Sequence, residues 1–245
     1  MALVEEFQSQ GQWLFRWRSY LPLILLPLIG VAMTTADLRS QARLDESWDY
    51  FCLAVSFLGL IVRVLTVGCV PQQTSGRNTT ELIADELNTT GMYSIVRHPL
   101  YLGNFLIGFG VSLVQCAWWL PVIYSLAFWL YYERIMFAEE AFLLQKFGDD
   151  YRRWAAVTPA FLPRFSKWRA ALLPFSWLHV LRREYTGLIT VILCHTGQVF
   201  FERLITDHRI VWEAFWATLL FSGLTAYFSL RWLTRNTTLL NVPGR

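Results

Sequence analysis

The stretch of this chain with the clearest capacity for chemistry is residues 91–105, which place Tyr93, Arg97, His98 and Tyr101 beside a long apolar run. A guanidinium, an imidazole and two phenol rings can together hold a charged small molecule and orient it. The simpler alternative is that Arg97 and His98 extend from a membrane segment toward lipid headgroups. A second polar segment close to this stretch would favour the first interpretation.

Proline and apolar residues predict the elements that carry this stretch. Pro99 lacks a backbone N–H and fits only the first turn of a helix, so Arg97 and His98 should lie just before a helix start. Two apolar segments follow, 100–115 and 117–132. Each is short for a hydrocarbon core of about 30 Å, so we expect a tight helical hairpin whose two ends meet.

A pair of carboxylates, Glu139 and Glu140, follows the second arm of this hairpin. The hairpin brings the pair toward Arg97 and His98, so the expected site is built from two segments. Side chains of adjacent helical residues point about 100° apart, so at most one glutamate should line a given pocket. The other would pair with a basic group such as Arg134 or Arg97. The alternative for the pair is a solvated helix face.

The composition identifies an integral membrane protein. Of the 245 residues, 55% are hydrophobic and only 16% are charged, and the mean hydropathy is +0.36, which is too apolar for an ordinary soluble domain. A net charge of +3 without a dense basic run argues against nucleic acid as a partner. The four scattered cysteines indicate neither a disulfide framework nor a metal site. Acidic residues near the N-terminus argue against a cleaved signal peptide.

Apolar runs and charged loops divide the chain into an all-α, polytopic membrane fold. We expect about six transmembrane helices, preceded by a segment at the headgroup interface. An Asn-x-x-Glu capping pattern predicts one further short helix. The expected spans are residues 20–35, 50–70, 100–115, 117–132, 187–201 and 211–230, with the interfacial segment at 1–19 and the short helix at 79–87.

The basic residues predict how this arrangement is oriented. Most of the 21 lysines and arginines precede the first span, follow the last one, or lie in residues 71–98 and 133–187. All of these segments fall on one side of a six-span arrangement. The positive-inside rule therefore puts both termini, and the site formed by Arg97 and Glu139, on the cytoplasmic side of the membrane.

Polar residues inside the expected spans need partners. Arg63 lies close enough to the end of its span to snorkel to the interface, and a functional role is the alternative. His195 and Gln198 are three residues apart and share a helix face. We expect them to form hydrogen bonds to other helices, with a substrate role as the alternative.

Two runs flank the expected hairpin and form a pattern. They are Gly91-x-Tyr93-x-x-x-Arg97-His98-Pro99-x-Tyr101-x-Gly103 and Glu139-Glu140-x-x-Leu143-x-x-x-Phe147-Gly148-x-x-Tyr151, followed by Pro159 and Pro163. The pattern, within residues 78–165, resembles the catalytic half of the isoprenylcysteine carboxyl methyltransferase and phospholipid methyltransferase family. This resemblance implies S-adenosylmethionine as the methyl donor, held on the cytoplasmic side. It also implies a membrane lipid or lipidated acceptor that enters from the bilayer.

Methyl transfer from a sulfonium is an in-line displacement that needs no protein nucleophile, so positioning and electrostatics carry the work. The resemblance divides the chain into an N-terminal part with two spans (1–77), a methyltransferase-like core (78–165) and an extension with two further spans (166–245). The candidate residues for catalysis and acceptor orientation are Arg97, Arg134 and Glu140. The candidate cofactor-binding residues are Leu87, Tyr93, His98, Pro99, Tyr101, Gly103 and Glu139.

The methyl acceptor is left open. A carboxylate such as that of a prenylcysteine is favoured, with a phospholipid amine and a lipid phosphate as alternatives. Carboxylate methyltransferases of this family can carry a basic residue four positions before the first glutamate, where this chain has Ile135. Two other functions compete: an NADPH-dependent enzyme like the sterol reductases, which share a similar Arg-His-Pro half-site, and a catalytically inactive scaffold. The oligomeric state is also left open.

Overall fold

The computed structural model describes residues 3–18, 20, 23, 25–34, 46–71, 84–207 and 213–244, and every regular element in these ranges is helical. The all-α prediction is therefore confirmed for the described part of the chain. The helices are α1 (Leu3–Trp17), α2 (Leu25–Thr34), α4 (Glu46–Val67), α5 (Pro99–Leu113), α6 (Trp119–Val157), α7 (Trp177–Asp207) and α8 (Ala214–Asn236), with short 3-10 turns at Gly91–Ser94 and Phe165–Lys167.

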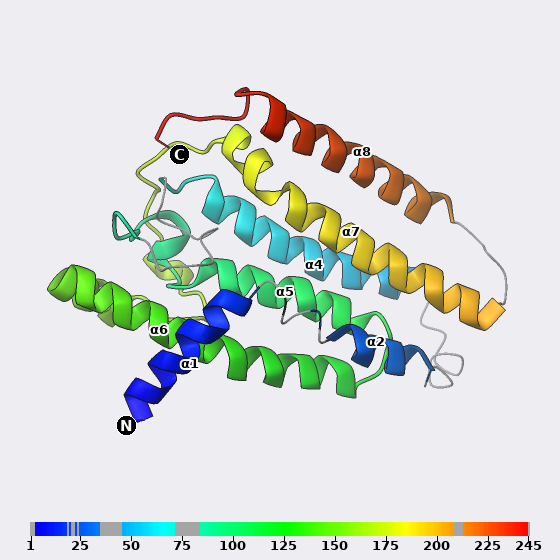
Figure 1. Cartoon of the computed structure of the whole chain (residues 1–245), viewed down its shortest axis with the longest axis horizontal. Coiled ribbons are helices and arrows are strands. Elements are labelled where there is room, and N and C mark those ends of the chain that lie inside the picture. Colours follow the sequence, from blue (N-terminus) through cyan, green and yellow to red (C-terminus); the bar gives the residue numbers. More distant parts are fainter. Residues whose placement is uncertain are drawn as a thin grey trace.

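The helices form a bundle in which α4 is central (Figure 1). Helix α4 packs against α5 on one side and α7 on the other, α8 covers α7, and α6 packs against α5. Helix α1 crosses α6 at an angle (Figure 1). The close contact of α4 with α5 depends on Gly59 and Gly103, because a Cβ at Gly59 would lie 2.5 Å from the carbonyl oxygen of Gly103.

Two of the described helices are long and apolar enough to cross a membrane, namely residues Glu46–Val67 and Trp177–Ile205. Helix α5 is apolar but shorter. The expected span at 20–35 is represented by α2, which has 10 residues. At about 1.5 Å per residue, a helix of this length is about half of what a bilayer crossing needs. The arrangement with about six spans remains a prediction.

The hairpin is confirmed, but its second arm is longer than expected. Helix α5 begins at Pro99, and the chain turns near Cys116, which has a φ of 53°. Helix α6 then continues through 39 residues to Val157 instead of ending near Tyr132, with non-helical geometry at Gly148 (φ 53°, ψ −120°). The two glutamates therefore lie within a continuous helical stretch. Of the expected short helix at 79–87, residues 84–87 are not helical, and 79–83 lie outside the described residues.

Polar contacts join the helices inside the bundle. The Nε2 atom of His195 lies 2.9 Å from the Oγ atom of Ser56 on α4. The side chain of Gln198 accepts a hydrogen bond from Gln115 and donates one to the carbonyl oxygen of Val111, each 3.1 Å long. The prediction that His195 and Gln198 form hydrogen bonds between helices is confirmed.

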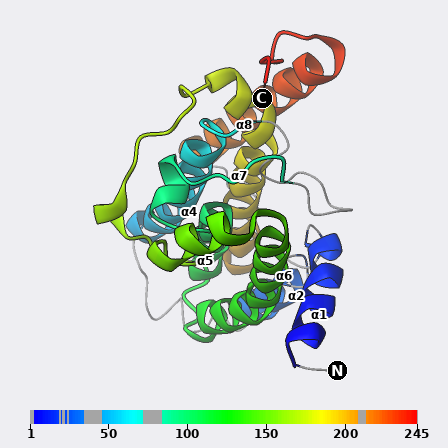
Figure 2. The ribbon, with the colours of Figure 1, turned by 90° about the vertical axis from the view of Figure 1, so that its left-hand side faces the viewer.

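One end of the bundle is closed by two segments that are far apart in the sequence. The chain before α5 and the chain after α6 are joined by backbone hydrogen bonds. The N–H groups of Arg97 and His98 donate to the carbonyl oxygens of Pro159 and Ala160 (2.9 and 3.2 Å), and the N–H of Arg164 donates to Ile95 (2.9 Å). Figure 2 views this end, where the connection from α6 to α7 runs around the outside of the bundle. These bonds fix the backbone that carries Arg97 and His98.

Candidate active site

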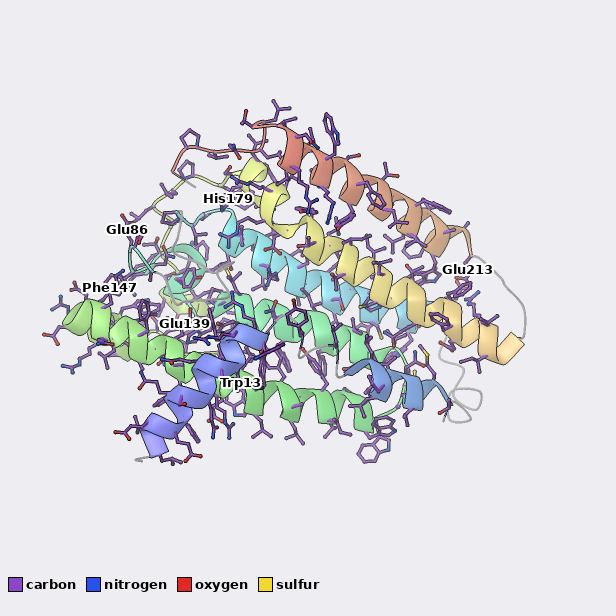
Figure 3. All side chains as sticks on the ribbon, viewed as in Figure 1. Trp13, Glu86, Glu139, Phe147, His179 and Glu213 are labelled. Carbon is purple, nitrogen blue, oxygen red and sulfur yellow. The ribbon has the colours of Figure 1, made fainter. Side chains whose placement is uncertain are left out.

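The imidazole of His98 lies between the two glutamates of α6. Its Nε2 atom is 2.9 Å from Oε1 of Glu140, and its Nδ1 atom is 3.6 Å from Oε2 of Glu139. In Figure 3, Glu139 lies toward the same end of the bundle as Glu86 and Phe147. Both glutamates contact the same imidazole, and the expectation that at most one of them lines a given pocket stays a prediction. Although the two side chains diverge along α6, the histidine presents one ring nitrogen to each of them.

The electrostatics of this cluster favour its charged form. Burial by itself lowers the pKa of His98, but its contacts with Glu139 and Glu140 and the negative charges of these two groups outweigh burial, so the pKa is raised above 6.5. Burial alone would raise the pKa of each glutamate. Contact with His98 lowers it by more, so both pKa values fall below 4.5. The two carboxylates thus favour the protonated, imidazolium form of His98.

Arg97 ties the start of α5 to α6. Its Nε atom lies 2.9 Å from Oε1 of Glu140, and its Nη1 donates to the carbonyl oxygens of Ala155 (2.9 Å) and Thr158 (3.2 Å). These carbonyls are at the C-terminal end of α6, where a cation also interacts favourably with the helix dipole. The prediction that the second glutamate pairs with Arg97 is confirmed. Arg97 therefore holds the two halves of the site together.

Gly148 interrupts helix α6 between Glu140 and Tyr151. Its combination of positive φ and negative ψ is accessible to glycine and strained for other residues. After this interruption, Tyr151 and Trp154 are buried, and the indole N–H of Trp154 donates to the carbonyl oxygen of Tyr93 (3.0 Å). Burial, followed by the charge of Glu140, raises the pKa of Tyr151. The residues after Gly148 thus close the site around Glu140.

Glu139 retains an unused hydrogen-bonding atom. Its Oε2 atom is buried and lies 3.6 Å from Nδ1 of His98, beyond hydrogen-bond distance, and no other described residue donates a hydrogen bond to it. A buried carboxylate oxygen without a donor is costly, so a ligand with N–H or O–H groups would be stabilised there. The ring of Tyr101 stacks on His98 next to it, with centroids 5.6 Å apart and planes 16° apart. This corner can accept a hydrogen bond and can also present an aromatic face to a cation.

The other candidate residues are distributed around this corner. Tyr93 and Leu87 are partly buried in the segment before α5, and Pro99 is buried in the first turn of α5. Gly103 packs against α4, because a Cβ there would lie 2.5 Å from Cγ of Arg63. Ile135, which stands where related carboxylate methyltransferases can carry a base, is fully buried. The direct contacts of Gly103 are thus with another helix.

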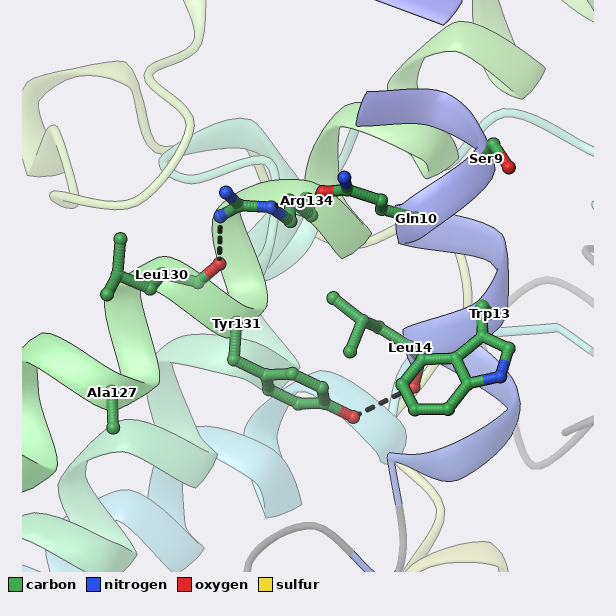
Figure 4. A pocket seen from close by; sticks show the side chains of 8 residues that line it. All are labelled: Ser9, Gln10, Trp13, Leu14, Ala127, Leu130, Tyr131 and Arg134. Carbon is green, nitrogen blue, oxygen red and sulfur yellow. Dashed lines mark hydrogen bonds between the residues drawn. The ribbon is translucent and has the colours of Figure 1, made fainter. Parts of the chain in front are cut away.

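Arg134 lies apart from the His98 cluster. It lines a cavity of about 600 Å³ between α1 and α6, together with residues that include Trp13 and Tyr131 (Figure 4). Its Nε donates to Oε1 of Gln10 (2.8 Å) and its Nη1 donates to the carbonyl oxygen of Leu130 (2.7 Å). The structure does not bring Arg134 together with the other candidate residues.

Two charged residues that sequence reasoning did not place in the site lie beside it. Arg63 of α4 forms a two-pronged ion pair with Glu184 of α7, with N···O distances of 2.8 and 2.9 Å. The snorkelling interpretation of Arg63 is therefore wrong, because its guanidinium is bound within the protein. The available sequence signal was Arg63 inside the apolar run 50–70 and Glu184 just before the apolar run 187–201. This signal does not predict the pairing, which depends on how the two helices are rotated.

The described residues contain no group of three or more His, Cys, Asp or Glu side chains that could hold a metal ion. The chain matches the family profile described as phospholipid methyltransferase over residues 50–150. No solved structure matches it significantly.

Curated relatives fall into two groups. A nickel-cobalt-cadmium resistance protein from Alcaligenes xylosoxydans xylosoxydans is 35% identical over 63% of this chain and 66% of the relative. A cobalt-zinc-cadmium resistance protein from Cupriavidus metallidurans is 31% identical over 62% and 64%. The chain thus spans slightly less than two thirds of these two relatives. Protein-S-isoprenylcysteine O-methyltransferase B from Arabidopsis thaliana is 30% identical over 57% of this chain and 72% of the relative.

Proposed function

Because this chain belongs to the isoprenylcysteine carboxyl methyltransferase and phospholipid methyltransferase family, we propose that it is a membrane enzyme that transfers a methyl group to a lipid or lipidated acceptor. We propose S-adenosylmethionine as the methyl donor. The observation that supports this assignment is the buried Oε2 atom of Glu139, which accepts no hydrogen bond from the described residues and lies next to the stacked rings of His98 and Tyr101.

The residues around this atom fit a cofactor that carries both a cation and hydrogen-bond donors. Glu139 can accept a hydrogen bond from an amino or hydroxyl group, and the rings of Tyr101 and Tyr93 can face a positive charge. S-adenosylmethionine, when bound, supplies an electrophilic methyl group on a sulfonium. The protein then needs no nucleophile of its own, and its contribution is to orient the two reactants and to keep water away.

The state of His98 favours a carboxylate acceptor. An amine must lose a proton before or during methylation, and this requires a general base. The two carboxylates favour the protonated form of His98, which cannot accept a proton, and the lowered pKa values of Glu139 and Glu140 make these groups weaker bases. A carboxylate is already ionised near neutral pH and needs no base. We therefore favour O-methylation of a carboxylate, such as that of a prenylated cysteine.

We further propose a multi-pass arrangement in which the His98 end of the bundle faces the cytoplasm. The excess of lysine and arginine near this end supports the orientation. A water-soluble donor would enter from that side, and a lipidated acceptor would arrive from the bilayer.

Cofactor binding tests the proposal first. We would titrate the purified protein with S-adenosylhomocysteine and with NADPH, using calorimetry in detergent. The expected result is binding of S-adenosylhomocysteine alone, weakened about 10- to 100-fold in Glu139→Gln, because a hydrogen bond to a charged group is lost. Arg134→Ala is the matched control and should bind like the wild type. Binding of NADPH alone would identify a reductase-like enzyme instead.

Methyl transfer tests it second. Membranes that contain the protein are incubated with S-adenosylmethionine labelled in the methyl group. Label that partitions with lipidated protein or lipid and is released by base indicates a methyl ester. Cofactor binding without transfer to any membrane component would support the inactive scaffold.

A further inference from the structure

A chain of hydrogen bonds runs from α7 through α4 and α5 to α6 and ends beside Tyr101. Arg63 pairs with Glu184 through Nε and Nη2, and its Nη1 donates to Oδ1 of Asn104 (2.5 Å). The Nδ2 atom of Asn104 then donates to the hydroxyl oxygen of Tyr132 (3.3 Å). The ring of Tyr132 lies 4.8 Å from that of Tyr101.

The guanidinium of Arg63 fixes the direction of the hydrogen bonds that follow it. A guanidinium only donates, so the oxygen of the Asn104 amide must face Arg63. The nitrogen of the amide must then face Tyr132, whose hydroxyl oxygen accepts. The hydroxyl hydrogen of Tyr132 therefore remains to be donated, and no acceptor for it is found in the part of the chain that the structure describes.

The ion pair of Arg63 and Glu184, from which this series of hydrogen bonds starts, is largely buried. The side chain of Glu184 is only 6% exposed and that of Arg63 is 22% exposed. Gly103 leaves the space that the stem of Arg63 occupies. A buried ion pair adds little net stability compared with apolar residues of similar size, so we look for its contribution in the groups that it orients.

We propose that Tyr132 is a specificity-determining residue that donates a hydrogen bond to the anionic group of the methyl acceptor, and that Glu184, Arg63 and Asn104 position it. This inference rests on the proposed function. It places a donor for the acceptor carboxylate one helical turn before Ile135, where no basic residue is present. It also gives α7, which lies outside the segment matched by the family profile, a part in the site.

Asn104→Asp tests the direction of these hydrogen bonds with almost no change in the shape of the side chain. The new carboxylate still accepts from Arg63, but it also accepts from Tyr132, so the tyrosine hydrogen is turned away from the acceptor. The probe is N-acetyl-S-farnesylcysteine, and its uncharged carboxamide analogue is the control ligand. With S-adenosylhomocysteine bound, Asn104→Asp and Tyr132→Phe should each weaken binding of the carboxylate probe about 10- to 100-fold. Binding of S-adenosylhomocysteine itself should not change.

The carboxamide separates an electrostatic role from a structural one. Both variants should weaken binding of the carboxamide clearly less than binding of the carboxylate, because its neutral carbonyl oxygen accepts a weaker hydrogen bond from Tyr132. Wild-type affinity for the carboxylate in Tyr132→Phe, or equal weakening of both probes, would overturn the inference. If the wild type binds neither S-adenosylhomocysteine nor either probe, the proposed function itself fails. If the wild type binds and methylates the probe and the two variants match it, only the role of Tyr132 fails.

The anchor is tested by removing both of its charges. Glu184→Leu alone leaves an unpaired buried arginine and is expected to unfold the protein, whereas the double variant Arg63→Met/Glu184→Leu leaves no unpaired charge and should fold. In the double variant the Asn104 amide is free to turn over, so binding of the carboxylate probe should weaken by several-fold with cofactor binding retained. A folded double variant with wild-type affinity for this probe would show that the ion pair does not position Tyr132.

Discussion

Replacing Glu140 by glutamine removes the charge that Arg97 and His98 share. In the wild type, Oε1 of Glu140 is 2.9 Å from Nε of Arg97 and 2.9 Å from Nε2 of His98. The side chains of Arg97 and Glu140 are 18% and 26% exposed, so solvent screens the pair only in part. One charge-assisted hydrogen bond and one ion pair are weakened, which gives a loss of about 2–4 kcal/mol in the free energy of unfolding.

The loss should depend on pH. The pKa of Glu140 is lowered in the folded state, so its contribution is present at neutral pH and disappears as the pH falls through that lowered value. The pKa of His98 is raised, so the contribution of its protonated form is complete below pH 6.5 and disappears as the pH rises through the raised value. The wild type and Glu140→Gln should therefore differ most between these two pKa values. They should converge in acid.

Thermal unfolding in detergent, followed from pH 3 to 9, measures this difference, and about 2–4 kcal/mol corresponds to a Tm shift of about 5–15 °C. Glu139→Gln is the matched control. Its Oε2 lies 3.6 Å from His98, beyond hydrogen-bond distance, so its loss should lower Tm less than the loss of Glu140 does while weakening cofactor binding. If Glu140→Gln were as stable as the wild type at every pH, or if Glu139→Gln were the less stable variant, the roles assigned to the two carboxylates would be refuted.

Three further substitutions test other parts of the structure. Gly148→Ala should lower the free energy of unfolding by about 1–3 kcal/mol. This cost comes from backbone strain alone, because a Cβ there meets no atom within 4 Å. Unchanged stability in chemical denaturation would contradict the observed turn. Arg134→Ala should cost about 1 kcal/mol through its contact with Gln10 and leave methyl transfer intact, and a large loss of transfer in a radiolabel assay would place the α1–α6 cavity in the active site. His195→Ala should cost about 2–4 kcal/mol, since it removes one of the two hydrogen-bond partners of Ser56 and leaves a cavity, and a Tm equal to that of the wild type would rule out this contact.

Several features of the site were predictable from the sequence because their causes are local. Pro99 fixes a helix start, since its ring is tolerated only in the first turn. The short apolar runs on either side of Cys116 require a hairpin, and the structure forms one. Once a hairpin is expected, the approach of His98 to Glu139 and Glu140 follows from its geometry. The match of residues 50–150 to the family profile agrees with that reading.

Where α6 would end was not predictable, because the apolar run ends near Tyr132 whereas the helix continues beyond it. The charged residues beyond Tyr132 continue the helix to Val157, interrupted only at Gly148. The first arm was predicted closely, since α5 runs from Pro99 to Leu113 and the expected segment was 100–115.

The sequence by itself determined the residue types of the site and the two segments that supply them. Only the tertiary structure decided which partners these residues take. Contacts between helices depend on the rotation and axial offset of each helix, and a hydrophobic pattern fixes neither to within one side chain. For this reason His98 could be assigned to the site from its motif. The sequence did not determine that Arg63 pairs with Glu184 or how this pair orients Asn104 and Tyr132. These contacts depend on how α4, α5, α6 and α7 pack together.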